Sequence, residues 1–445
     1  MKPVSRRSFL GTAASATVAF PFIGWKTAAA GKKPSETVQV AAFGGNGRAF
    51  GDISATMKHK STNLVAVAEV DNARTGAVRQ RFKKSKVYQD WRELLEKEAK
   101  NIDVVVVGTP DHMHAPISMA GMQLGKHCYC EKPLTRTLDE CRALTDYAAE
   151  QKLITQMGNQ LASGQGNKAT AKALRDKVIG KVVAIHSMCP KSWGSMKPLG
   201  VSSDPPESLD WDQWIGVAKM RPYVKGEFHP AQWRKRIGYG TGTLGDMACH
   251  IVHPWCKGID SPEVISVKSV GPAPVDEDSW PLDGRIEYNL KGNEYTDGKI
   301  PFTWYDGKNV PGDDLVQLVG DRKNIPVMGT VIVGTKGVIT ANHGRDPFPK
   351  IYRDGKLTDE KIDPPAAADH HGEFIDNVLG RAKGTVCDFN YAGPMTETVL
   401  LGTVAMLVPG EELKWNSKKL RFTNSEAANK HVKDKYREGW EVKGL

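Results

Sequence analysis

Residues 38–49 read VQVAAFGGNGRA, a short apolar run followed at once by a glycine-rich turn. The run 38–43 predicts a strand, and the turn predicts the start of a helix that continues to about Met57. A turn of this kind lets the backbone approach a pyrophosphate, whose negative charge the free N–H groups of the helix N-terminus favour. The stretch therefore predicts the first strand–helix unit of a dinucleotide-binding sheet.

Strands and helices continue to alternate after this unit. Apolar runs at 64–68, 102–107 and 127–130 predict further strands, and helical patterns lie near 72–82, 91–99, 115–124 and 138–151. Alternation at this spacing is typical of βαβ units, in which helices cover both faces of a parallel sheet. We therefore predict an α/β fold whose N-terminal domain, residues 36–155, is a Rossmann-type doubly wound parallel sheet.

The rest of the chain has a different composition and no longer alternates regularly between strands and helices. Residues 190–245 are rich in Trp, Pro, Gly and Lys, which indicates long loops over a site, and several later runs read as strands. We predict a second, sheet-based domain at 156–365, and an extension at 366–445 that packs back on the other domains.

The first thirty residues have the pattern of a targeting segment. Residues 5–10 read SRRSFL, a modest apolar stretch reaches residue 25, and three alanines at 28–30 fit a small-residue cleavage rule. We expect a twin-arginine signal peptide, residues 1–30, that delivers the folded protein to the export machinery and the periplasm. The alternative is a basic N-terminus that contains two arginines by chance.

Composition narrows the classes of function. The chain has 445 residues, 40% of them hydrophobic and 25% charged, as in ordinary globular proteins. No run approaches the ~20 apolar residues that a membrane helix needs. The net charge is +10, and four positives in the first thirty residues leave +6 (10 − 4) for the rest. Basic residues do not interleave with aromatic ones in a stripe, so we expect no nucleic-acid partner.

The glycine-rich turn supplies the first candidate cofactor residues, which are Gly44, Gly45, Asn46, Gly47 and Arg48. Counted from Gly44, the strict G-x-G-x-x-G pattern is imperfect, because asparagine occupies the second glycine position and alanine the third. Glu69 ends the second strand at the spacing where a carboxylate binds the adenosine ribose hydroxyls. It would repel a 2′-phosphate, which favours NAD over NADP, although Arg74 nearby weakens that preference.

Two further loops leave the carboxyl ends of predicted strands, where ligands bind in open parallel sheets. The first carries Thr109, Pro110, His112 and His114, and the second carries Glu131 and Lys132. The alternative is that both are ordinary surface loops.

Asp246 and His250 are four residues apart and share one face if residues 246–257 form a helix. An imidazole beside a carboxylate can hold a proton near neutral pH, as hydride transfer from a carbinol requires. Two alternatives stay open. In the first, His253 joins Asp246 and His250 as a third metal ligand on one helical face, although we expect no metal. In the second, Asp246 merely caps a helix whose histidines lie in the core.

The motifs GGNGRA, VAVAEVD, GTPDHMHA and CEKPLT, followed by GTGTLGDMACH at 240–250, occur in that order. In this arrangement the chain resembles the glucose–fructose oxidoreductase, inositol dehydrogenase and MocA (Gfo/Idh/MocA) family. The resemblance implies a Rossmann domain followed by an α+β domain with a large open-faced, mostly antiparallel sheet, and a homodimer or homotetramer.

The resemblance also implies residue roles. Lys132 matches the lysine between nicotinamide and substrate, His250 the general acid/base, and Asp246 its partner. Gln160 resembles the family's turn near the nicotinamide. Candidate substrate contacts are Trp193, His229, Trp233 and Arg234. Trp211 and Trp214 either stack on a sugar or pack the domain junction, and His370 and His371 are either site or surface residues.

We therefore expect an NAD(P)-dependent oxidoreductase that transfers hydride between a sugar or polyol carbinol and a nicotinamide. The first alternative is an NAD-dependent glycoside hydrolase whose retained cofactor is oxidised and reduced in each cycle. The second is a non-catalytic protein that binds a sugar or nucleotide. Lys132, Asp246 and His250 together speak against this second alternative.

Overall fold

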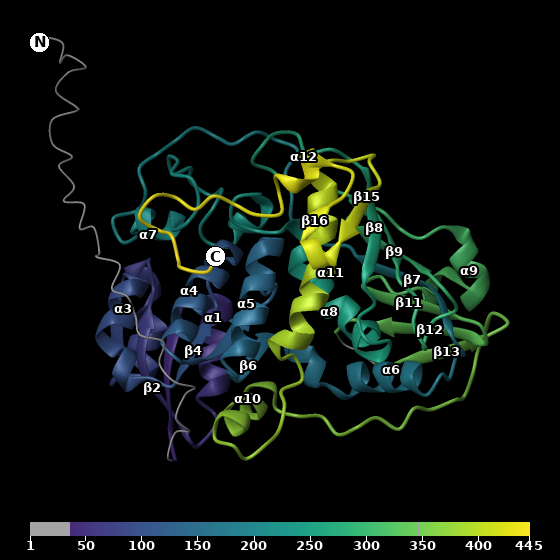
Figure 1. The fold of residues 1–445 in the computed structure, drawn as a ribbon, viewed down its shortest axis with the longest axis horizontal. Coiled ribbons are helices and arrows are strands. Elements are labelled where there is room, and N and C mark those ends of the chain that lie inside the picture. The colour runs from purple at the N-terminus through teal and green to yellow at the C-terminus, as the bar shows by residue number, and fades with distance from the viewer. Residues whose placement is uncertain (1–35, 345–347) are drawn as a thin grey trace, which may run out of the picture.

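The computed structural model describes residues 36–344 and 348–445, which fold around two β-sheets (Figure 1). The twin-arginine pattern and its expected cleavage point lie outside the described residues. Among the helices that are described, none has both the length and the apolar character needed to cross a membrane.

The first sheet has six parallel strands in the order β3-β2-β1-β4-β5-β6. They are β1 (Val38–Phe43), β2 (Thr62–Ala68), β3 (Lys86–Tyr88), β4 (Val104–Val107), β5 (His127–Glu131) and β6 (Thr155–Gly158). The connecting helices are α1 (Gly47–Thr56), α2 (Gly76–Arg81), α3 (Trp91–Glu98), α4 (His114–Gln123) and α5 (Leu138–Glu150). This topology confirms the predicted Rossmann domain. The strand order reverses between β1 and β4, and ligands bind at such a point.

The second sheet has ten strands, ordered β14-β13-β12-β11-β7-β10-β9-β8-β15-β16. They are β7 (Val182–Cys189), β8 (Val264–Gly271), β9 (Arg285–Leu290), β10 (Ile300–Asp306), β11 (Gly329–Gly334), β12 (Gly337–Asn342), β13 (Lys350–Arg353), β14 (Lys356–Leu357), β15 (Leu413–Asn416) and β16 (Arg421–Phe422). Only β7 and β10 pair in parallel, so the sheet is mostly antiparallel, as expected. The C-terminal segment supplies β15 and β16 to this sheet.

Helices join the two sheets into one core. α6 (Gln165–Arg175), α8 (Gly242–Gly258) and α11 (Phe389–Leu407) pack together, and α11 also packs on α5 of the first domain (Figure 1). Buried side chains from both domains form one continuous hydrophobic cluster. α9 (Asp313–Val319) covers part of the opposite face of the second sheet, and α10 (His370–Val378) packs on α1.

A long irregular segment of the second domain, residues 190–241, reaches back over the first. It carries α7 (Trp211–Ile215), and Asp210 donates its backbone N–H to Val70 at 2.9 Å. The C-terminal residues after α12 (Glu426–Asn429) follow the same side, where Arg437 donates its backbone N–H to Val217 at 2.9 Å (Figure 1). We call residues 190–241 the crossing segment; it lies over the carboxyl ends of β1, β2 and β4.

Candidate active site

The turn after β1 is built for close approach of its backbone to a ligand. Gly44 has a φ of +94°, and a Cβ there would lie 2.7 Å from the Cβ of Ala49. A Cβ on Gly108, after β4, would lie 2.8 Å from the same atom. Asn46 caps α1, because its Oδ1 accepts the backbone N–H of Gly47 at 2.6 Å. This cap explains why asparagine can replace the second glycine of the usual pattern.

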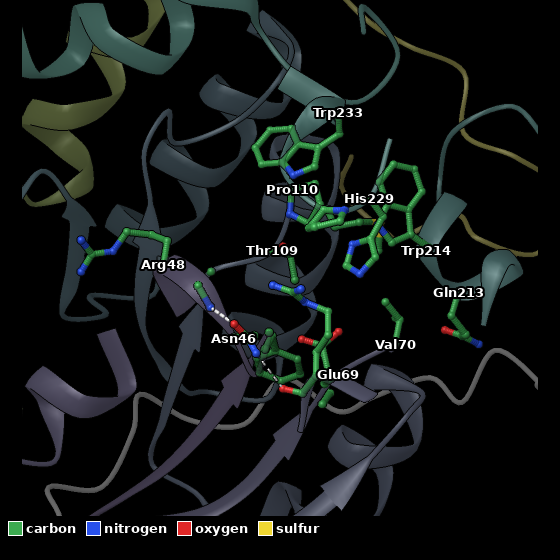
Figure 2. Close-up of a pocket in the computed structure, with 18 of the residues that line it drawn as sticks. Asn46, Arg48, Glu69, Val70, Thr109, Pro110, Gln213, Trp214, His229 and Trp233 are labelled. Carbon is green, nitrogen blue, oxygen red and sulfur yellow. Dashed lines mark hydrogen bonds between the residues drawn. The ribbon is translucent and has the colours of Figure 1, made fainter. Parts of the chain in front are cut away.

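A pocket lies where the strand order reverses. One wall is the glycine-rich turn with Glu69, Thr109 and Pro110, and the crossing segment supplies the facing wall (Figure 2). The residues of that facing wall are Gln213, Trp214, His229, Pro230, Ala231, Trp233 and Arg234. A concave site with glycine backbone on one side and aromatic rings on the other fits a dinucleotide.

Glu69 lies at the end of β2, as the sequence predicted. Its Oε2 accepts the N–H of Gly45 at 2.7 Å and its Oε1 accepts that of Asp71 at 3.0 Å. The carboxylate therefore holds the turn in place and remains in the pocket wall, where ribose hydroxyls would reach it. His229 pairs with Asp71 at 3.1 Å and so joins the two walls.

Arg48, Glu131 and Gln160 form a polar network beside the pocket. The guanidinium of Arg48 pairs with Asp52 at 2.6 Å and points away from the other labelled side chains (Figure 2). Gln160 donates to Glu131 and, at 3.0 Å, to the hydroxyl of Tyr129. Burial, followed by the charge of Asp52, raises the pKa of Glu131. Arg48 lines the pocket and Glu131 and Gln160 lie beside it, and direct contact of these three residues with the cofactor stays a prediction.

His112 and His114 both hold backbone together. His112 contacts the rings of Trp214 and Tyr239, and its Nε2 lies 3.1 Å from the carbonyl of Trp214. His114 bonds the carbonyls of Pro133 at 2.8 Å and Thr109 at 2.9 Å. These bonds use both ring nitrogens of His114 and give both histidines a structural role, and their contact with the cofactor stays a prediction.

Lys132 and Asp246 form the centre of the site. The Lys132 Nζ donates to Asp246 Oδ1 at 2.8 Å and to the Asp246 carbonyl at 2.6 Å. Burial alone would lower the pKa of Lys132, but Asp246 and Glu131 outweigh it and raise that pKa. Burial would raise the pKa of Asp246, yet Lys132 and Arg234 hold it well below its usual range. The pair is therefore ionised.

His250 lies one turn further along α8 and has a different partner from the predicted one. Its Nδ1 is 2.7 Å from the Oδ1 of Asn159, whose Nδ2 donates to the Cys249 carbonyl at 2.8 Å. Asp246 instead accepts hydrogen bonds from Lys132, from Arg234 at 3.1 Å and from the indole N–H of Trp193 at 2.9 Å. The helical spacing predicted that Asp246 and His250 share one face. It could not show that the Asp246 carboxylate would pair with the cationic side chains of Lys132 and Arg234.

The electrostatics favour a neutral His250. Burial, then the charges of Lys132 and His343, lower its pKa well below the usual value, and Asp246 opposes them only in part. Because the Asn159 amide nitrogen donates to the Cys249 carbonyl, its oxygen faces Nδ1 and accepts a hydrogen bond from the Nδ1–H. The lone pair is then on Nε2, so the imidazole can act as a base.

The remaining histidines of the prediction have internal partners. His253 Nδ1 is 2.9 Å from the Tyr391 hydroxyl, so it does not join Asp246 and His250. Residues 36–344 and 348–445 contain no cluster of three His, Cys, Asp or Glu that could hold a metal ion. His370 bonds Ser163 at 2.9 Å, and His371 bonds Asp52 at 3.2 Å and stacks on Tyr129.

The structure packs Trp211 and Trp214 together in the crossing segment, and stacking of either ring on a sugar stays a prediction. Their rings stack with centroids 4.8 Å apart in an apolar cluster of the crossing segment, although Trp214 also lines the pocket. Trp233 and Arg234 line the pocket as well, and Trp193 lies on the Asp246 side.

Sequence reasoning missed Lys191, Asn159 and His343. Lys191 Nζ is 3.6 Å from Asp246 Oδ2, and the rings of His250 and His343 are 5.3 Å apart. Asn159 directly precedes Gln160, which the sequence predicted to lie near the nicotinamide. Gln160 could therefore have pointed to Asn159 as a further site residue. His343 follows β12, about ninety residues after α8, and no local pattern connects the two.

Comparison with known proteins gives two family models that cover most of the chain. "Oxidoreductase family, NAD-binding Rossmann fold" matches residues 38–159, and "Oxidoreductase family, C-terminal alpha/beta domain" matches residues 191–442. The second model alone spans more than half of the chain.

Curated relatives match over shorter stretches. A levoglucosan dehydrogenase from Pseudarthrobacter phenanthrenivorans is 26% identical over 186 residues, 42% of this chain and 40% of that protein. An alpha-N-acetylgalactosaminidase from Shewanella oneidensis is 28% identical over 157 residues, 33% of this chain and 34% of that protein. The matches thus span well under half of these relatives.

Solved structures share the fold over nearly their whole length. The WlbA dehydrogenase from Bordetella pertussis, in complex with NADH and UDP-GlcNAcA, has a TM-score of 0.59 at 14% identity, over 85% of this chain and 99% of that one. An inositol dehydrogenase homolog from Azotobacter vinelandii, with NADH and myo-inositol, has a TM-score of 0.56 at 16% identity, over 87% and 100%. Together with the two family models, these findings show that the chain belongs to the Gfo/Idh/MocA family of oxidoreductases.

Proposed function

We propose that the protein is an NAD-dependent oxidoreductase that transfers hydride between a carbinol carbon of a sugar or polyol and the nicotinamide. The observation that carries this proposal is the meeting of Lys132, from the end of β5, with Asp246 and His250 of α8. Arg234 belongs both to this group and to the pocket wall, so the group adjoins the dinucleotide pocket.

Each side chain has a definite task in this chemistry. The Nε2 of His250 takes the proton of the substrate hydroxyl, which a neutral imidazole can do. The ammonium of Lys132 stabilises the negative charge that develops on the oxygen, and Asp246 holds that ammonium in place. NAD, when bound, would supply the hydride acceptor.

We further propose that NAD is preferred to NADP. The Glu69 carboxylate lies in the pocket wall and would repel a 2′-phosphate. Arg74 lines the same pocket and moderates the preference without removing the carboxylate.

A second candidate, an NAD-dependent glycoside hydrolase, is favoured by the contacts that join the two walls of the pocket. The crossing segment bonds both Val70 and Asp71 of the first domain, an arrangement suited to a cofactor that stays bound through the cycle. The relative named as an alpha-N-acetylgalactosaminidase points the same way. A protein exported with its cofactor would need such retention, because free NAD is scarce outside the cytoplasm.

Export through the twin-arginine machinery to the periplasm, and assembly into a homodimer or homotetramer, remain part of the proposal. Residues 5–10 support export, and the family resemblance, which includes a large ten-stranded second sheet, supports assembly. Fractionation of cells and light scattering of the purified protein test these two statements.

The experiment that tests the function starts with the purified protein, which is denatured and assayed for released NAD(H). The intact protein is then incubated with free sugars plus NAD, and separately with nitrophenyl glycosides without added NAD. NADH formation supports the dehydrogenase, whereas glycoside cleavage supports the hydrolase. If the protein neither releases nor binds NAD(H), both candidates are wrong and a cofactor-independent binding protein remains.

A further inference from the structure

Three cations surround a single carboxylate at the candidate active site. Asp246 is 2.8 Å from Lys132 Nζ, 3.1 Å from Arg234 Nε and 3.6 Å from Lys191 Nζ. We call these four residues the Asp246 cluster. Its charge is +2 (three positive minus one negative), which is unusual for a partly buried group, because uncompensated charge is costly away from water.

Neighbouring groups do not remove this excess. His250 and His343 add no charge when neutral, and burial lowers the pKa of His343 to about 4. Asp111 is a buried carboxyl that interacts with Arg234 and Lys132, and burial raises its pKa. Even when ionised, it would leave one positive charge. Glu131 interacts with Lys132 as well as with Arg48 at 3.6 Å, but burial raises its pKa and so favours its uncharged form.

The cofactor increases the imbalance at this point. The nicotinamide ring of oxidised NAD is itself positive, and a neutral sugar brings no negative charge to offset it. A negative group on the substrate would restore the balance, and Coulomb attraction in a partly buried site strengthens such a contact.

Lys191 has the geometry to receive this group. Its side chain is 46% exposed, and within residues 36–344 and 348–445 its ammonium has only the long contact to Asp246 and a contact to the Met247 sulfur at 3.0 Å. Arg234, whose guanidinium lies over the ring of Trp233, adds a planar donor fork suited to an oxyanion.

We propose that the substrate is a sugar bearing an anionic substituent, a carboxylate or a sulfate ester, and that Lys191 and Arg234 bind this substituent. The inference rests on the proposed function, because it assigns a substrate class to the same site. Lys132 and His250 then remain free to act on the carbinol.

Calorimetric titration of the NADH-loaded protein tests this assignment without requiring turnover. The ligands are D-glucose and D-galactose, D-glucuronate and D-galacturonate, and galactose 6-sulfate. We expect at least one acidic sugar to bind about tenfold more tightly than its neutral counterpart, with a smaller advantage in high salt. Preference among the acidic ligands distinguishes carboxylate from sulfate. If no acidic sugar binds more tightly than its neutral partner, the inference is overturned.

A matched pair of variants locates the contact. Lys191→Met should reduce the acidic-to-neutral affinity ratio about fivefold or more, whereas Lys219→Met, an exposed lysine of the same crossing segment, should leave it unchanged. Thermal melting checks that both variants are folded. An equal ratio in wild type and Lys191→Met would overturn the role of Lys191.

The same samples separate this inference from the proposed function. Acidic sugars that bind selectively but give neither NADH nor glycoside cleavage contradict the function and leave the anionic specificity standing. Turnover of neutral sugars without any acidic preference contradicts the specificity alone.

Discussion

At the residue scale, the amide of Asn159 determines which nitrogen of His250 carries the proton. Its Nδ2 is committed to the Cys249 carbonyl and its Oδ1 to His250 Nδ1, so Nε2 is left as the acceptor. Asn159 is therefore a positioning residue, which acts on the substrate only through the imidazole.

Asn159→Asp tests this role through a pH profile. A carboxylate beside Nδ1 raises the pKa of His250, so the base becomes protonated, and activity is lost, at a higher pH than in wild type. We expect the acid limb of kcat/KM to move up by roughly one to two pH units. Asn159→Leu should lower kcat without that upward movement. An acid limb that stays in place in Asn159→Asp would contradict the assignment.

The two groups proposed to touch substrate make a direct prediction. Lys132→Ala and His250→Ala should each reduce turnover by about 10²-fold or more, because each removes a charge or proton acceptor used in the transition state. Stopped-flow measurement of NADH formation or the glycoside assay supplies the rate. Near-normal turnover in either variant would exclude that residue from the mechanism.

Glu69 provides the prediction for cofactor choice. Glu69→Gln keeps an acceptor for the Gly45 N–H but removes the charge that opposes a 2′-phosphate. The ratio of NADP to NAD dissociation constants should fall about tenfold, measured by fluorescence titration. The matched control is Glu93→Gln, because Glu93 is an exposed carboxylate of α3 that pairs with Lys97. An unchanged ratio would show that Glu69 does not discriminate.

At the element scale, the sequence predicted the Rossmann strands and the helix of Asp246 well, because both depend on local periodicity. The all-valine run of β4 is buried on both faces, as its composition indicated. The placement of Gly44 and Glu69 followed from the same pattern. The partners of Asp246 could not be predicted, since Lys191 and Arg234 lie at opposite ends of the crossing segment and Lys132 follows β5, so that their meeting depends on tertiary packing.

The helix α8 also carries a buried histidine that affects stability. Burial lowers the pKa of His253 to about 3, whereas the unfolded chain protonates near 6.5. As the pH falls below 6.5, the unfolded state binds a proton that the folded state does not. His253 then lowers the free energy of unfolding by about 1.4 kcal/mol per pH unit.

His253→Gln isolates this contribution and keeps an acceptor for the Tyr391 hydroxyl. Urea unfolding at pH 6 and pH 5 should show the wild type losing about 1.4 kcal/mol more than the variant over that unit. Equal losses in both proteins would mean that His253 is protonated in the folded state.

At the scale of the whole molecule, the two domains share one active site because the second domain reaches over the first. The sequence indicated loops over a site at 190–245, but their path could not be derived, since the aromatic rings that hold them have no periodicity. The structure places Trp214, His229 and Trp233 opposite the glycine-rich turn (Figure 2). A dinucleotide in this pocket would therefore contact both walls at once.

Hydrogen exchange tests this arrangement, because a ligand that bridges two walls suppresses the local opening of both. With saturating NADH, amides of residues 208–240 should exchange more slowly, while the β13–β14 hairpin at the far edge of the second sheet should be unaffected. His229→Ala breaks the contact to Asp71 and should weaken NADH binding severalfold, with less protection at equal occupancy. If NADH protects the glycine-rich turn but leaves residues 208–240 unchanged, the crossing segment is not a wall of the cofactor site, and retention of the cofactor would have to arise within the first domain alone.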